Sequence, residues 1–222
     1  MSTTRPFVQL SLGHPLRSIL AEAGDTSDFP LGHIIFEQGD PSDRLYVLHS
    51  GKVKIGRTSA AGREHVLGIG GPSDMFGELS IFDPGPRTCT ATTLTEVRAA
   101  SIDGRELRQW ITNMPQIAVH LLPLLARRAR HLDSALTDLI TDNVSGRLAT
   151  VLLDLAEQFG TEKRGMLVVT HDLTQREIAQ MIGAARKTVN ETLADFTRRG
   201  WLLRGDKSVL ILDPTALASR AR

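Results

Sequence analysis

The segment FGELSIFDPGPRTCTA, residues 76–91, places Glu78 and Arg87 among mostly small and apolar side chains. A buried charge is costly unless another group compensates it. An arginine forms forked, charge-assisted hydrogen bonds with an anion, and a glutamate accepts hydrogen bonds. The two side chains could therefore pair with each other or bind an anionic ligand.

A second group of polar side chains lies in LTQREIAQMIGAARKTVNETLADFTRRGWL, residues 173–202. Thr174 and Glu177 form a T-x-x-E capping box, and Gly183 supplies a tight turn before a second helix that begins near Ala185. Two short helices joined in this way predict a helix-turn-helix. An ordinary αα-hairpin has the same shape, so DNA binding depends on the outer face of the second helix.

That outer face carries side chains that suit DNA. Arg186 matches the acceptors of guanine and Asn190 matches adenine, near the helix N-terminus where base edges are reached. Gln175, Thr188 and Lys207 are placed to meet phosphates, the last in a wing formed by GDKSVLIL. A solvated polar face would have the same composition. The complete set of candidate DNA-binding residues is Gln175, Arg176, Ala185, Arg186, Lys187, Thr188, Asn190, Glu191 and Lys207.

Short strands are expected to position the first segment. Between Leu31 and Asp103, the apolar runs HIIF, RLYVLHSGKVKIG, REHVLGIGG and TATTLTEVRAASID alternate with glycines and turn residues. Short, regularly spaced strands predict a small β-barrel or roll. Before them, HPLRSILAEAG (residues 14–24) predicts one short helix.

After Ile102 the pattern becomes helical. GRELRQWI predicts one short helix, and Pro115 suits the first turn of the next. In that next helix, Pro123 predicts either a kink or the start of the regular part. An a/d heptad pattern favours a coiled-coil dimer, and a helix packed on its own domain is the alternative. The pattern consists of Leu122, Leu125, Ala129, Leu132, Leu136 and Leu139.

The rest of the chain completes an α+β fold with three parts. We expect an amphipathic helix at 143–160, a polar loop at 160–165, and strands at MLVVT and SVLIL. The predicted parts are an N-terminal helix and β-roll at 1–114, a dimerisation helix at 115–141, and a C-terminal winged helix-turn-helix at 142–222.

Composition narrows the class of protein. The 222 residues are 41% apolar and 23% charged, which is typical of a soluble globular protein. The net charge of +1 gives no strong field toward nucleic acid. One cysteine, Cys89, excludes a disulfide framework and a four-cysteine iron–sulfur cluster. No run is as long as a membrane span and the N-terminus lacks a secretory signal, so we expect a cytoplasmic protein without a membrane partner.

The β-roll, FGELSIFDPGPRT, the heptad helix and TQREIAQMIGAARKTVNETL follow one another in an order that resembles the cyclic-AMP receptor protein/FNR family of bacterial transcription regulators. The likeness is greatest to the actinobacterial cyclic-AMP receptor branch and covers roughly residues 31–212. It implies a homodimer, a cyclic-nucleotide-binding roll, and a winged helix-turn-helix that binds palindromic double-stranded DNA. RNA polymerase is a further partner that it implies.

The resemblance also assigns a ligand site. Gly77, Glu78, Leu79 and Ser80, preceded by Phe76, match the family's phosphate-binding segment, and Arg87 and Thr88 match residues that hold the cyclic phosphate. Glu78 would accept from the ribose 2′-OH. The implied ligand is 3′,5′-cyclic AMP or a related cyclic nucleotide, with no cofactor and no metal. A structural Glu–Arg pair in an empty roll is the alternative.

The chain departs from the family on the ligand side of the long helix. Where cyclic-AMP binders carry Thr followed by Ser or Asn against the adenine, this chain has Leu132 and Asp133. The loss of a hydroxyl partner predicts a weaker or altered base preference. It also raises the alternative of a regulator with a degenerate pocket, which binds DNA without cyclic nucleotide or responds to a different ligand.

The recognition helix departs too. Arg186 matches the family's guanine-reading arginine. Lys187 stands where the family usually has a glutamate, and Glu191 stands where it usually has a basic residue. An acceptor for cytosine has become a donor, so we expect a half-site that differs from the family's usual TGTGA.

Three other functions are alternatives to a cyclic-nucleotide-controlled regulator. A haem or iron–sulfur sensor would have to use Cys89 or scattered histidines such as His33, His49 or His65. An enzyme is disfavoured because no nucleophile–base pair lies beside Glu78 and Arg87, and GxSxG, Walker and HExxH motifs are absent. A dimeric adaptor without DNA binding is the third.

Overall fold

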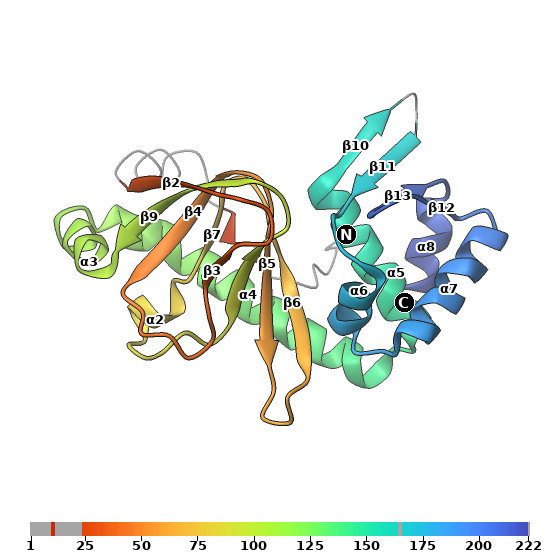
Figure 1. Cartoon of the computed structure of the whole chain (residues 1–222), viewed down its shortest axis with the longest axis horizontal. Coiled ribbons are helices and arrows are strands. Elements are labelled where there is room, and N and C mark those ends of the chain that lie inside the picture. The colour runs from red at the N-terminus through yellow and green to blue at the C-terminus, as the bar shows by residue number, and fades with distance from the viewer. Residues whose placement is uncertain (1–9, 12–23, 164–165, 222) are drawn as a thin grey trace. The chain divides into compact units, whose positions relative to one another are not determined.

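The computed structural model describes residues 10–11, 24–163 and 166–221 (Figure 1). Contacts divide the described chain into two compact units, the first ending at Arg130 and the second beginning at His131. The division falls inside helix α4 (Gln116–Thr141). The short helix predicted at 14–24 lies outside the described residues.

The first unit is a roll of two antiparallel sheets, as predicted. One sheet has the order β1-β7-β4-β9-β2 and the other β3-β8-β5-β6. Gly51, with φ +85°, turns the chain from β4 into β5, and a Cβ there would lie 2.1 Å from the Glu96 carbonyl oxygen. The strands are β1 (Leu10–Ser11), β2 (Asp25–Phe29), β3 (Ile34–Phe36), β4 (Arg44–Ser50), β5 (Val53–Thr58), β6 (Glu64–Gly70), β7 (Asp74–Phe76), β8 (Thr90–Thr93) and β9 (Val97–Asp103).

Two apolar clusters hold the roll and its helices together. Leu48, Val53 and Phe76 belong to a cluster inside the roll. A second cluster joins the roll to α2 (Leu79–Phe82), α3 (Gly104–Asn113) and α4 through Ile81, Leu107, Ile117, Leu121 and Leu124. The single helical turn α2, which follows Glu78, is therefore held in place by the packing of Ile81 in this second cluster.

Helix α4 presents two apolar faces. Leu121 and Leu124 are buried against the roll. On the heptad seam, Leu122 is 63% and Leu132 46% exposed, and Ala129 and Leu136 are exposed too, whereas Leu125 is half-buried beside the core. The side chain of Leu139 lies outside the described residues. Helix α4 begins before Pro123 and continues through it, so Pro123 is not the start of the helix.

The second unit is a helical domain with one four-stranded sheet, ordered β10-β11-β13-β12. Leu148, Leu152, Val189, Phe196 and Leu202 are buried in it. Residues 160–163 were predicted as a loop but form a strand paired with β11, because backbone pairing at a sheet edge does not require apolar side chains. The elements are α5 (Val144–Phe159), β10 (Gly160–Lys163), β11 (Met166–Thr170), α6 (Gln175–Ile182), α7 (Arg186–Arg198), β12 (Leu202–Arg204), β13 (Ser208–Ile211) and α8 (Pro214–Arg220).

The predicted helix-turn-helix is present as α6 and α7. Thr174 and Glu177 form the capping box at the start of α6, and Gly183 ends the helix in the left-handed conformation, with φ +62°. Strands β12 and β13 form the wing, with Lys207 at its turn. Among the described residues, no helix combines the length and hydropathy needed to span a membrane.

Candidate functional site

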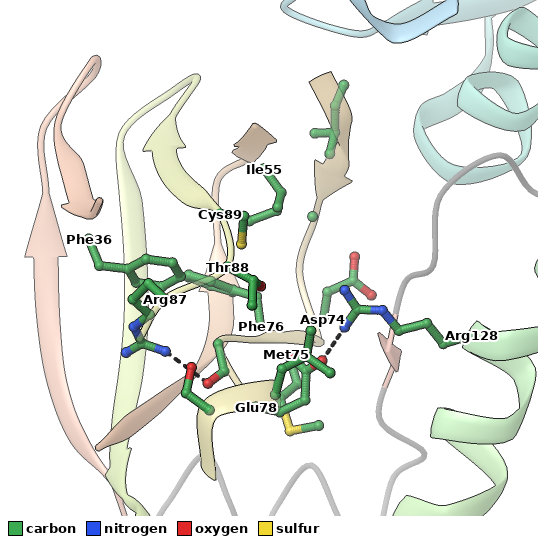
Figure 2. Close-up of a pocket in the computed structure, with 15 residues that line it drawn as sticks. Phe36, Ile55, Asp74, Met75, Phe76, Glu78, Arg87, Thr88, Cys89 and Arg128 are labelled. Carbon is green, nitrogen blue, oxygen red and sulfur yellow. Dashed lines mark hydrogen bonds and ion pairs between the residues drawn. The ribbon is translucent and has the colours of Figure 1, made fainter. Parts of the chain in front are cut away.

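The first unit contains a cavity between the roll, α2 and the first half of α4 (Figure 2). All the roll residues predicted for the ligand site line it: Phe76, Gly77, Glu78, Leu79, Ser80, Arg87 and Thr88. Phe36, Ile55, Ile69, Gly70, Asp74, Met75, Cys89 and Arg128 complete the lining. The cavity encloses about 40 Å³, room for a few water molecules.

Arg87 is buried, with 5% of the residue exposed, and is held by backbone carbonyls. Its Nη1 donates to the Gly77 oxygen at 2.8 Å and its Nη2 donates to the Arg44 oxygen at 2.6 Å. The guanidinium carbon lies 3.9 Å from the centre of the Phe36 ring, and burial lowers the pKa of Arg87. Within the described part of the chain, the buried Nε of Arg87 has no hydrogen-bond partner. One N–H of the guanidinium of this lining residue is therefore left without an acceptor.

Gly77 makes this arrangement of Arg87 possible. Its φ of +81° is a conformation that other residues rarely adopt, and a Cβ there would lie 2.6 Å from the Arg87 Nη1. The chain then turns into α2, where the Ile81 and Phe82 amides donate to the backbone carbonyl oxygen of Glu78. Glycine before the acid is thus required by the packing of the arginine.

Glu78 is 1% exposed, and its partner is Arg128 of α4, whose Nη1 donates to its Oε1. Burial raises the pKa of the Glu78 carboxyl, while Arg128 and, more weakly, Arg87 lower it. Figure 2 shows Arg128 entering the cavity from the side opposite Arg87. The alternative of a structural Glu78–Arg87 pair differs from what the structure shows, since Glu78 accepts from Arg128 and Arg87 donates to two backbone carbonyls. Sequence reasoning missed Arg128, whose signal was its place in RRAR, one helical turn before Leu132.

Asp74 and Cys89 are two further polar residues in the lining of the cavity. Asp74 is buried and accepts from the Gly71 amide at 2.7 Å, which fixes the turn before β7. Burial raises the pKa of the Cys89 thiol, so this lining residue is held in the neutral form. Among the described residues, no group of three or more His, Cys, Asp and Glu side chains could hold a metal ion.

Leu132 and Asp133 lie on α4 within the second compact unit, and Leu132 is exposed. The lining of the cavity includes one residue of α4, Arg128. The expected effect of Leu132 and Asp133 on a base therefore stays a prediction.

The second unit presents the predicted DNA-binding residues on α6, α7 and the wing. Arg186, Lys187 and Glu191 are exposed on α7, and the Lys187 Nζ lies 3.9 Å from the Glu191 Oε1. Thr188 and Asn190 are half-buried on the same helix. Gln175 and Arg176 begin α6, Ala185 is the N-cap of α7, and Lys207 is exposed at the tip of the wing.

The Asn190 side chain lies partly inside the second unit. Its Oδ1 is buried, and no described residue donates a hydrogen bond to it. A bidentate contact with adenine needs both the oxygen and the nitrogen of the amide. The contact of Asn190 with adenine stays a prediction.

Two family models match the chain. A cyclic nucleotide-binding domain matches residues 26–113, and a Crp-like helix-turn-helix domain matches residues 146–220. The chain is 60% identical over 195 residues to a CRP-like cAMP-activated global transcriptional regulator of Mycobacterium tuberculosis, covering 88% of this chain and 87% of the relative.

More distant relatives extend the likeness. The chain is 31% identical to the cyclic AMP receptor protein of Thermus thermophilus, over 85% of this chain and 84% of the relative. A crystal structure of a CRP/FNR-family transcriptional regulator from the same species aligns with a TM-score of 0.70 and 27% identity, over 89% of this chain and 98% of that one.

Proposed function

Since the chain belongs to the cyclic-AMP receptor protein/FNR family of transcription regulators, we propose that a cyclic nucleotide binds in the cavity and controls DNA binding by the second unit. The chain is a DNA-binding regulator with a cyclic-nucleotide sensor domain. Its relatives are regulators and not enzymes. Cyclic AMP is the first candidate ligand, because the Mycobacterium tuberculosis relative is described as cAMP-activated.

The observation that carries this proposal is the buried, unpartnered Nε of Arg87 in a cavity of this chemistry. A cyclic phosphate supplies acceptors for that donor, and Thr88, which is exposed, and Ser80, which is buried, belong to the same lining. A phosphate would also compensate the charge of Arg87 better than the two carbonyls that now hold it.

The ribose end involves Arg128. A 2′-OH that donates to Glu78 has to share the carboxylate with the arginine already bonded to it. Because Arg128 belongs to α4, occupancy of the sensor is transmitted to the helix that carries the heptad seam.

We place the dimer contact on that seam, within residues 115–141. Leu122, Ala129, Leu132 and Leu136 form an exposed apolar row, which a second copy of the helix would bury. Two copies present two recognition helices, which fit a palindromic site when they lie about one DNA turn, ~34 Å, apart. The regulator would act on DNA in the cytoplasm, and RNA polymerase as a partner rests on the resemblance alone.

A second candidate keeps the same DNA target without the ligand requirement. Leu132 and Leu136 add apolar area to the seam, so a dimer already close to its DNA-binding state is favoured. Retention of an operator fragment with and without cyclic AMP separates the two candidates, because the ligand changes retention only if it controls the dimer.

The proposal is tested by calorimetric titration of the full chain with cyclic AMP and cyclic GMP. We expect binding with weak selectivity between the two bases and a loss of binding in Arg87→Lys, which keeps the charge but not the fork. Failure of the folded protein to bind either nucleotide would contradict the sensor role. Strong selectivity for cyclic AMP would contradict the altered base preference.

A further inference from the structure

Lys187 and Glu191 form an exposed pair near the start of α7. The lysine side chain is 87% exposed and the glutamate 63%, one helical turn apart, with 3.9 Å between Nζ and Oε1. Arg186 is the first residue of the helix and Lys187 the second. The pair therefore lies on the N-terminal half of the recognition helix, the part that meets base edges in helix-turn-helix proteins.

Helix stability does not account for this order of charges. The N-terminal turn of a helix favours acids, yet the first turn of α7 contains two basic residues and no acidic one. A lysine four residues before a glutamate is also the weaker orientation of such a pair. An exposed pair of this kind adds little to folding. This order of charges does not stabilise the free helix. It therefore indicates a binding partner outside the chain.

The two side chains match one base pair. In the major groove, guanine presents the acceptors O6 and N7, and its cytosine presents the N4 donor beside them. Lys187 can only donate and Glu191, when ionised, can only accept. A T·A pair presents two acceptors, adenine N7 and thymine O4, but the adenine N6 donor lies between them and the thymine methyl group lies beside O4, so the ammonium finds no two adjacent acceptors.

We propose that Lys187 and Glu191 read one G·C base pair of each half-site as a unit, with Lys187 on the guanine and Glu191 on the cytosine. This inference rests on the proposed DNA-binding function and specifies the base pair that the site recognises. It also determines which strand carries the guanine, because the donor Lys187 and the acceptor Glu191 lie one helical turn apart.

Asn190 strengthens the assignment. Its Oδ1 is buried, whereas the Lys187 and Glu191 side chains are exposed, so these two side chains are better placed than Asn190 to reach a base edge. Arg186, the residue before Lys187, contacts a different guanine of the half-site. That guanine serves as an internal reference in the experiment. A change at the Lys187–Glu191 pair should leave the Arg186 position of the site unchanged.

The test is selection of binding sites from a random duplex library by the full-length protein in the presence of cyclic AMP. The wild type is compared with the exchanged variant Lys187→Glu/Glu191→Lys. We expect one position in each half-site to change from G·C to C·G and the rest of the site to stay the same. Arg199→Ala, at the C-cap of α7, is the control and should select the wild-type sequence.

A second measurement needs no variant. The wild type is titrated against its selected site with the four possible base pairs at that position, and we expect roughly 5- to 150-fold weaker binding to C·G than to G·C. Equal binding to G·C and C·G, enrichment of T·A, or the same selected site from wild type and exchanged variant would each overturn the inference. In all three of those outcomes DNA binding persists, so the proposed function stands, whereas a wild type that retains no DNA defeats both.

Discussion

The sensor cavity and the recognition helix both contain arginine or lysine beside glutamate, but in opposite environments. In the cavity, Glu78 is buried and bonded to Arg128, and Arg87 is bonded to two carbonyls. On α7, Lys187 and Glu191 are exposed and lie 3.9 Å apart. Desolvation makes the first set of charges depend on each other, while water screens the second set. Substitutions in the cavity should therefore change folding, and substitutions on α7 should change DNA binding alone.

The largest effect is expected from Arg128→Ala. It leaves the buried Glu78 without its ion-pair partner, and breaking a buried pair in this way costs about 3–5 kcal/mol of unfolding free energy. Urea denaturation of the full chain measures it. Arg127→Ala, on the exposed side of the same helix turn, should change stability by at most ~0.5 kcal/mol.

The pH dependence of that variant gives a further check. Burial raises the pKa of Glu78 and Arg128 lowers it, so removing Arg128 raises the pKa further. The folded variant then binds the Glu78 proton more tightly than the unfolded chain does, so its stability falls as pH rises through the carboxyl range. Acidification or the added change Glu78→Gln should restore stability. If Arg128→Ala costs no more than Arg127→Ala, the charges of the cavity are not mutually dependent.

Gly77→Ala is expected to have the next largest effect. The added Cβ needs a strained φ of +81° and would lie 2.6 Å from the Arg87 Nη1, so we expect a loss of about 2–4 kcal/mol. Gly62→Ala is the matched control, since its φ is +74° but nothing lies within 4 Å of the new Cβ. Its loss should be about 1–2 kcal/mol, from backbone strain alone. Equal losses in urea denaturation would show that Arg87 yields to the methyl group.

The residues changed in Arg128→Ala and Gly77→Ala also show which features of the structure the sequence could predict. The capping box, Gly183 and the glycine-punctuated strands define local structure, because each acts over a few residues of chain. The pairing of Glu78 with Arg128 joins positions 50 residues apart, and a basic residue in RRAR gives no sign of which acid it meets. Strand β10 escaped prediction for a related reason, since its pairing with β11 uses backbone groups and its side chains are polar.

On the recognition helix, Arg186→Ala should weaken operator binding by about 1–3 kcal/mol without changing the unfolding free energy. Arg186 is exposed at the first position of α7, and its side chain can therefore reach a guanine. Fluorescence anisotropy with an operator fragment measures the loss, and Arg199→Ala provides the control. Unchanged retention of DNA would favour a dimeric adaptor over a regulator.

The smallest effect on folding is expected from Lys187→Gln. This variant tests whether the exposed charges of α7 serve DNA binding and not stability, unlike the buried charges of the cavity. The change removes a weak exposed ion pair and also an unfavourable cation from the start of α7, and the two contributions offset each other to within ~0.5 kcal/mol. Thermal unfolding should therefore hardly move, although the same variant loses its preference for guanine in the binding-site selection. A clear destabilisation would mean that Lys187 supports the helix. The lysine would then resemble the arginines of the cavity, and its exposure would no longer indicate a role toward DNA.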